Sequence, residues 1–173
     1  TDFWTMLFKS DSLSVKSVDE ISTFFMAEQS RLRLLLTLFD QHKIFLTNIA
    51  DLFENALNSL ADRSRSSNLC ARMFCVLLLA KLYQNKLTAD EVFSLLNNAY
   101  AHTQEIILIH IGKILSHQDS IGMKAEHVDK LSQALKRLIS NLDDNPDNSI
   151  LMQATIEYSK QAIKQQPNQS MRP

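Results

Sequence analysis

Apolar residues recur at three- and four-residue steps along most of the chain, which is the pattern of amphipathic helices. The most regular set predicts a helix that Thr47 caps, with a buried face formed by Ile49, Leu52, Phe53, Ala56, Leu57 and Leu60. A second segment, which Asn68 caps and which runs to about Asn85, is apolar on nearly every side. Its longest apolar run, residues 73–80, is far shorter than the ~20 residues of a membrane span. We therefore expect this helix at the centre of a packed domain.

The segment before these two helices carries the same periodicity over a longer stretch. Ser17 and Glu20 have the spacing of a capping box and open a pattern that predicts one continuous helix as far as Phe39. Leu34 and Leu38 lie opposite the main apolar face of that helix. We therefore expect its second half to be buried all round.

The clearest helix start in the chain is at Thr88. Thr88 and Glu91 have capping-box spacing, and Leu87 and Val92 have the spacing of a hydrophobic staple. The pattern predicts that the helix ends at a break near residues 102–103.

The last third of the chain predicts three more helices. An isoleucine-rich segment, residues 104–117, is read as a helix because no partner strand occurs elsewhere, and Gly112 within it suggests close helix packing. Turns at 119–122 and 143–148 flank a helix over 125–142. The final helix is expected to carry Ile150, Leu151, Ala154, Tyr158, Ala162 and Ile163 as its apolar residues.

These elements predict an all-α fold, a single globular bundle of seven main helices and a short N-terminal one. The predicted domain covers residues 1–164, with 1–16 as a short segment and linker, and residues 165–173 form a flexible polar tail. The pairs at 46–47 and 87–88 are both Leu-Thr, 41 residues apart, a spacing similar to HEAT-like or armadillo-like repeats. The helix that is apolar all round fits a globular bundle better.

Composition narrows the function classes. The 173 residues are 45% hydrophobic with a formal net charge of −1, which excludes a strong electrostatic binder of nucleic acid. Two glycines leave no Gly-rich phosphate loop.

Cys70 and Cys75 face directions about 140° apart on a helix, so they do not suit a disulfide bridge or a shared metal ion. With no disulfide framework, an intracellular, reducing compartment is expected. Because Thr1 is not a methionine, we expect a piece of a longer protein.

The histidines and serines form no catalytic or metal-binding pattern. His110 and His117 lie roughly 10 Å apart along a helix, too far for two ligands of one ion, and the five histidines are interpreted as surface or helix-end residues. The chain has no Gly-x-Ser-x-Gly elbow and no Glu-x-x-His pair. The sequence therefore predicts no enzyme, no metal and no cofactor.

Two segments remain as candidate sites. Arg63 and Arg65, together with the helix that starts at Asn68, could hold a phosphate or a lipid headgroup. The second candidate is an apolar face of a short helix that could dock on a partner: Phe3, Trp4, Leu7 and Phe8.

The function that fits these observations is non-catalytic: a protein-interaction or scaffolding domain of a larger intracellular protein, located in the cytoplasm. Eleven Asn and eleven Gln make its polar surface amide-rich, a composition also found in secreted bacterial effectors. If the chain is such an effector, it would act in the host cytosol. One alternative is a phosphoinositide or membrane-surface module that uses Arg63 and Arg65. Another is a helical enzyme domain with dispersed catalytic residues.

Overall fold

The computed structural model describes residues 17–58, 66–99 and 101–164, and these form eight α-helices and no strand. The all-helical class expected from the sequence is confirmed. Contacts between helices divide the chain into two compact units, Thr1–Lys86 and Leu87–Pro173, each with four of the described helices. The single domain over 1–164 stays a prediction. The expected N-terminal helix within 1–16 and the tail 165–173 lie outside the described residues.

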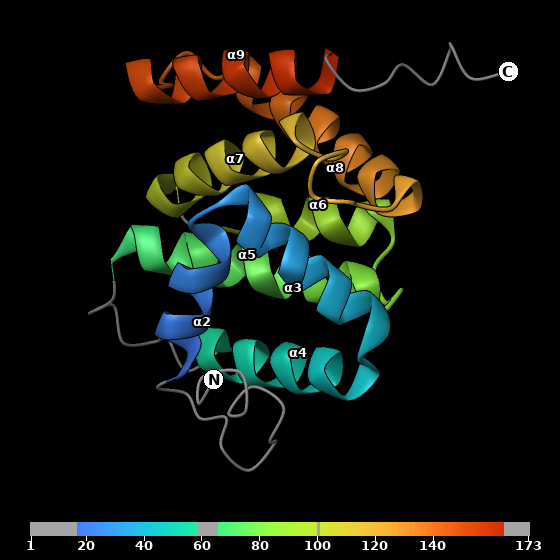
Figure 1. Ribbon diagram of the computed structural model, residues 1–173. Coiled ribbons are helices and arrows are strands. Elements are labelled where there is room, and N and C mark those ends of the chain that lie inside the picture. The colour runs from blue at the N-terminus through green and yellow to red at the C-terminus, as the bar shows by residue number, and fades with distance from the viewer. Residues whose placement is uncertain (1–16, 59–65, 100, 165–173) are drawn as a thin grey trace, which may run out of the picture. The chain divides into compact units, whose positions relative to one another are not determined.

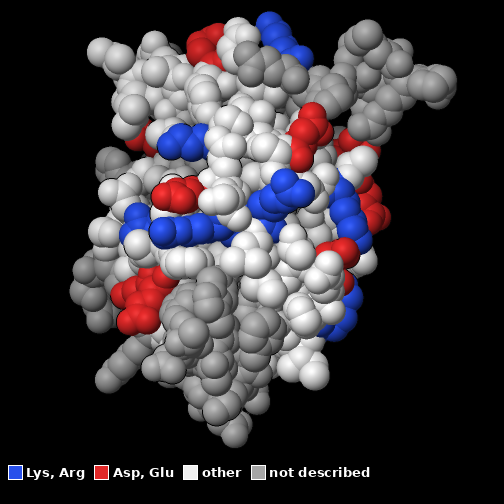
Figure 2. Space-filling model, viewed as in Figure 1, with Lys and Arg blue, Asp and Glu red and all other residues white. Residues whose placement is uncertain are grey.

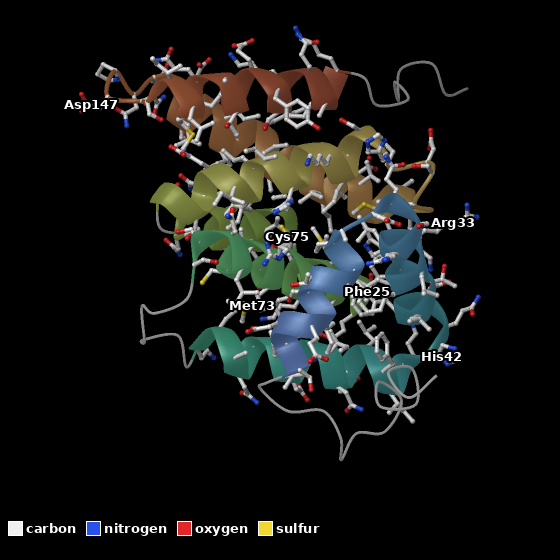
Figure 3. The ribbon with its side chains drawn as sticks, turned by 60° about the vertical axis from the view of Figure 1, so that its left-hand side comes forward. Phe25, Arg33, His42, Met73, Cys75 and Asp147 are labelled. Carbon is white, nitrogen blue, oxygen red and sulfur yellow. The ribbon has the colours of Figure 1, made fainter. Side chains whose placement is uncertain are left out.

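The first unit is built around one helix that contacts the other three. Its helices are α2 (Ser17–Met26), α3 (Gln29–Gln41), α4 (Lys43–Asn58) and α5 (Ser67–Tyr83) (Figure 1). The ring of Phe39 in α3 lies 5.9 Å from that of Phe45 in α4 and 6.1 Å from that of Tyr83 in α5. Phe25 of α2 points in among the same helices (Figure 3). α5 is therefore the central helix of this unit, as its apolar circumference predicts.

The single helix predicted from Ser17 to Phe39 is wrong, because the chain breaks between α2 and α3. Glu28 at the break has extended backbone angles, φ −145° and ψ 152°, and its side chain makes no capping hydrogen bond. Neither glycine nor proline marks this position. The second half is not buried all round either, since Leu38 is 8% exposed but Leu34 is 36% exposed.

Two predicted helix starts in this unit also need correction. Thr47 is an exposed residue inside α4, which begins at Lys43, so the Leu-Thr pair that suggested a repeat does not open a helix there. Asn68 is not the cap of α5. The Oγ atom of Ser66 accepts the hydrogen bond from the backbone N–H of Leu69 at 3.2 Å, which makes Ser66 the N-cap.

α5 ends without a glycine. Asn85 has a left-handed backbone, φ 59°, which asparagine tolerates better than most residues. The N–H of Lys86 donates to the carbonyl of Lys81 at 3.2 Å, and the N–H of Asn85 donates to that of Leu82 at 3.0 Å. This pair of bonds is a Schellman motif, and it places the helix end at Tyr83–Gln84.

The second unit packs its helices in pairs. Its helices are α6 (Ala89–Asn97), α7 (Ala101–Ser116), α8 (Ala125–Asp143) and α9 (Ile150–Lys164), with α6 on α8 and α9 on both α7 and α8 (Figure 1). α8 contributes a fully or nearly fully buried stripe of Val128, Leu131, Leu135 and Leu138. The isoleucine-rich segment is helical, as predicted.

The capping box at the start of α6 is confirmed. The N–H of Glu91 donates to Thr88 Oγ1 at 3.2 Å, and the N–H of Thr88 donates to Glu91 Oε1 at 3.0 Å. The two staple residues, Leu87 and Val92, are both buried. The break predicted near residues 102–103 is present but lies earlier in the chain, because α6 ends at Asn97 and α7 begins at Ala101.

Candidate functional site

α9 exposes apolar side chains beside the face that packs within its unit. Ile150 is 87% exposed, Leu151 55% and Tyr158 38%, and Ala154 is exposed as well. We call these four residues the outer face of α9. An exposed apolar patch on an ordered helix is informative, because apolar side chains gain free energy when they leave water.

The apolar residues that the sequence marks on this helix do not separate its buried side from its exposed side: Ala162 is buried, whereas all four outer-face residues are exposed. The residues that α9 buries are Met152, Thr155, Ile156, Ser159 and Ala162. Two of these five carry hydroxyl groups, which weakens the hydrophobic signal of the buried side. Thr155 Oγ1 donates to the carbonyl of Leu151 at 2.7 Å, so the helix itself satisfies this hydroxyl.

Hydrogen bonds fix the first turn of α9. Ser149 Oγ accepts from the N–H of Met152 at 3.0 Å and donates to Glu105 Oε1 of α7 at 3.1 Å. Asn148 Nδ2 donates to the carbonyl of Leu142, the second-to-last residue of α8, at 2.6 Å. The start of α9 is therefore anchored to both neighbouring helices, which holds Ile150 and Leu151 in place.

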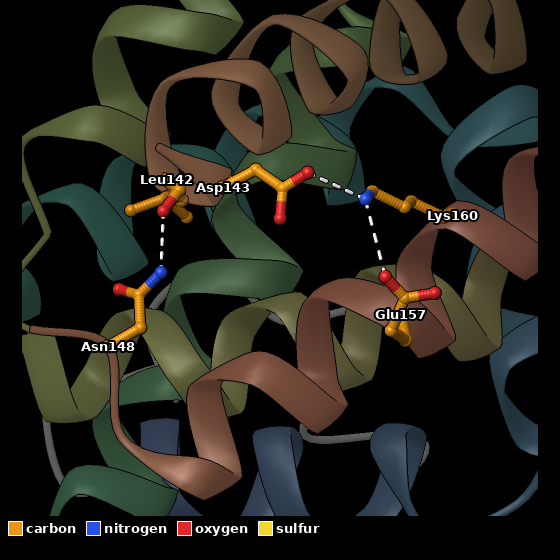
Figure 4. A network of polar contacts seen from close by, with 5 residues as sticks. All are labelled: Leu142, Asp143, Asn148, Glu157 and Lys160. Carbon is orange, nitrogen blue, oxygen red and sulfur yellow. Dashed lines mark hydrogen bonds and ion pairs between the residues drawn. The ribbon is translucent and has the colours of Figure 1, made fainter. Parts of the chain in front are cut away.

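An ion-pair network joins the middle of α9 to α8. Lys160 Nζ lies 2.7 Å from Asp143 Oδ2 and 3.3 Å from Glu157 Oε1 (Figure 4). The hydrogen bond to Asp143, followed by that to Glu157, raises the pKa of Lys160 above its ordinary value. All three side chains are partly exposed, so the network orients α9 more than it stabilises the fold.

Gly112 allows α9 to lie close to α7. A Cβ atom at position 112 would lie 2.6 Å from Cε2 and 3.0 Å from Cδ2 of Tyr158. The close helix packing predicted at Gly112 is confirmed. This contact also fixes the ring of Tyr158, the largest side chain of the outer face.

We expect Gly112→Ala to move the Tyr158 ring outward with little net change in stability. The methyl group clashes with the ring, while alanine favours a helix interior over glycine by about 1 kcal/mol. In a Tyr158→Ala background the clash is absent, so the same substitution should raise the free energy of unfolding by up to about 1 kcal/mol. Urea denaturation of the four proteins measures this cycle. An equal effect of Gly112→Ala in both backgrounds would contradict the contact.

The two sites proposed from sequence fall mostly outside the described residues. Arg63 and Arg65 lie there, and so do all four docking residues, Phe3, Trp4, Leu7 and Phe8. Asn68 is described: it is the exposed second residue of α5, after the cap Ser66. The anion site and the N-terminal docking face therefore stay predictions.

The histidines occupy different environments. His42 is exposed at the end of α3 and points away from its unit (Figure 3), in line with the sequence interpretation. His127 is only 2% exposed, so it is not a surface residue, but as the third residue of α8 it does lie at a helix end. Its Nε2 lies 3.9 Å from Glu126 Oε1. Among the described residues, no group of three or more His, Cys, Asp or Glu side chains could hold a metal ion.

An open depression lies between α2 and α3 in the first unit. Its lining residues are Asp19, Glu20, Thr23, Phe24, Ala27 and Arg31. The guanidinium of Arg31 lies over the ring of Phe24, 4.4 Å from its centroid, and its Nε is 3.9 Å from Glu28 Oε2. Because Arg31 is engaged by its own neighbours, the outer face of α9 is the stronger candidate site.

The surface of the second unit over α9 is largely uncharged, apart from a few acidic and basic side chains (Figure 2). None of the helices in the described ranges is both long and apolar enough to cross a membrane. Comparisons with protein-family models, with curated proteins and with solved structures find no match to this chain.

Proposed function

We propose that this chain is a non-catalytic protein-interaction module that binds another protein on the outer face of α9. The observation that carries the proposal is the exposure of Ile150 and Leu151, and of part of the Tyr158 ring, on a helix that is packed and anchored within its unit. A held helix binds at a low entropy cost, because its side chains are already arranged before the partner arrives.

The shape of the outer face favours a partner helix over a small ligand. Ile150, Ala154 and Tyr158 follow one another at four-residue steps, and such rows form the ridges that pack into the grooves of a second helix. Small-molecule sites are concave. A scaffolding role is compatible with this ridge, because a ridge that docks on a partner helix holds that partner without any catalytic group.

The charges around the outer face disfavour a membrane surface. From residue 143 to residue 164 the chain carries four carboxylates, Asp143, Asp144, Asp147 and Glu157, against two lysines, Lys160 and Lys164. Anionic lipid surfaces attract basic segments and repel acidic ones. We therefore favour a protein partner for α9.

Site-specific photo-crosslinking in the source cells tests the proposal. A photo-reactive residue at position 151 should form a covalent adduct with a protein. The same residue at position 133, an exposed site on α8, serves as the control and should not form that adduct. If both positions give the same adducts, or neither gives any, the outer face is not an interaction site.

A further inference from the structure

We infer that the break between α2 and α3 is a hinge, and that two copies of this chain exchange their α2 helices when it straightens. In the exchanged dimer, α2 and α3 form one continuous helix, and each α2 packs in the first unit of the other copy. The hinge lies within the first unit and does not involve the outer face of α9.

The sequence around the break favours a continuous helix. Residues 27–29 are Ala, Glu and Gln, which are all strong helix formers, and neither glycine nor proline occurs between residues 17 and 41. Apolar residues keep helical spacing from one side of the break to the other, with Glu28 as the one polar residue in their series. They are Ile21, Phe25, Leu32, Leu35 and Phe39.

The backbone at the break is weakly held in its bent form, in which α2 and α3 meet at an angle (Figure 1). Glu28 is extended, and its side chain gives α3 no capping hydrogen bond. Residues 27–30 are all exposed, so no buried side chain fixes the chain there. In a continuous helix, the N–H groups at this point would donate to carbonyls four residues earlier. The local backbone therefore favours the straight form.

The packing of α2 is what favours the bend in a single chain. Val18, Ile21 and Phe25 are fully buried, and α2 contacts α3, α4 and α5. A single chain with a straight helix would expose these side chains to water, which costs free energy. Two chains that exchange α2 bury the same side chains in the same surroundings. The exchanged dimer therefore keeps the core of the first unit and removes the break.

One contact across the break belongs to the bent form. The guanidinium of Arg31 in α3 lies 4.4 Å from the centroid of the Phe24 ring in α2. In a straight helix the two residues would lie about 10 Å apart along the axis, which would lengthen this contact. Arg31 therefore stabilises the bend and opposes the exchange.

Refolding of the full chain from urea tests the exchange. At about 500 μM we expect a dimer that size-exclusion chromatography separates, and at about 5 μM we expect monomer alone. The isolated dimer should persist for hours on dilution, because each α2 must leave its packed position before the copies separate. A chain that refolds only to monomer at the higher concentration, or a dimer that dissociates at once on dilution, would overturn the inference.

Gln29→Pro tests the hinge. Proline suits the first position of a helix but not its interior, and the extended backbone of Glu28 suits a residue before proline. We expect the variant to retain the helical signal and urea midpoint of the monomer, and to lower the dimer yield at least about 10-fold. Ala89→Pro makes the same change at the first position of α6, after the extended residue Thr88, and should leave the yield unchanged. Equal dimer yields from the two variants would overturn the inference.

Arg31→Ala should act in the opposite direction, because it removes the contact that stabilises the bend. We expect the dimer yield to rise several-fold. Arg33→Ala removes an exposed arginine from the same helix and should leave the yield unchanged. A yield for Arg31→Ala that is no higher than that for Arg33→Ala would overturn the inference.

Spin labels measure the shape of the hinge in each species. Thr23→Cys and Thr37→Cys place labels at exposed positions of α2 and α3, in a Cys70→Ser background that removes the accessible thiol. These positions lie about 21 Å apart in a straight helix and closer together in the bent form. With excess unlabelled chain, so that only distances within one chain are measured, the dimer should give the longer distance. The same distance in monomer and dimer would overturn the inference.

Discussion

Replacing Ile156 with aspartate should destabilise the second unit by at least about 4 kcal/mol. Ile156 is 1% exposed and lies on the packed side of α9. The substitution loses the burial of an isoleucine, about 1.5–3 kcal/mol, and places a carboxylate where water cannot solvate it. We expect the protein to unfold partly or fully at 25 °C, measured as a loss of helical signal in far-UV circular dichroism and a fall in the urea midpoint.

The matched substitution Ile150→Asp should change stability by less than about 0.5 kcal/mol. Ile150 is 87% exposed, so its replacement removes little buried area, and an aspartate in the first turn interacts favourably with the helix dipole. The same Ile→Asp substitution is therefore expected to lower the free energy of unfolding strongly on one side of α9 and hardly at all on the other. Equal destabilisation at positions 150 and 156 would show that the outer face is buried and would remove the basis for the proposed function.

Features of the fold that depend on residues close together in the sequence could be predicted from the sequence alone. The start of α6 is an example, because Thr88 and Glu91 satisfy each other's backbone donors within one turn. Gly112 is another. A glycine inside a helix costs about 1 kcal/mol relative to alanine, so its presence in an apolar helix indicates a close contact that needs the missing side chain.

The break between α2 and α3 could not be predicted in this way. The apolar residues on either side of it, Phe25 and Leu32, lie seven positions apart, so the helical pattern continues in phase across Glu28. The chain leaves the helical conformation there without a residue that favours the change. Contacts of α2 and α3 with α5 and α4 determine the two helix directions, and such contacts are not visible in a local pattern.

The candidate site was missed for a related reason. Hydrophobicity alone assigns Ile150 and Tyr158 to the core and Thr155 and Ser159 to the surface, but the structure reverses this. Small side chains allow α9 to lie close to its neighbours, and Thr155 satisfies its hydroxyl within the helix. The signal that could have located the outer face is the second apolar stripe formed by Met152 and Ile156, four residues apart.

The thiol of Cys75 should react about 1,000-fold more slowly than an ordinary cysteine at pH 8. Cys75 is 1% exposed in α5, and burial raises its pKa from 9.0 to about 12. Only the thiolate is nucleophilic, so three pKa units reduce the reactive population by about 1,000-fold. A Cys70→Ser variant, which retains only this thiol, measures the rate with an aromatic disulfide reagent. In 8 M urea, the rate should rise to that of a free thiol.

Cys70 provides the control for this measurement, and pH provides a second test. Cys70 is partly exposed, so a Cys75→Ser variant should react much faster than Cys70→Ser in the folded state.

Because the pKa of Cys75 is higher in the folded chain than in the unfolded chain, the neutral thiol favours folding below pH 9. That contribution is lost as the pH rises from 9 toward 12, since the unfolded chain releases the proton first. The stability advantage of the parent protein over Cys75→Ala should therefore shrink above pH 9. A constant difference, or fast labelling of Cys75 at pH 8, would show that α5 opens readily to solvent and is not the fixed centre of its unit.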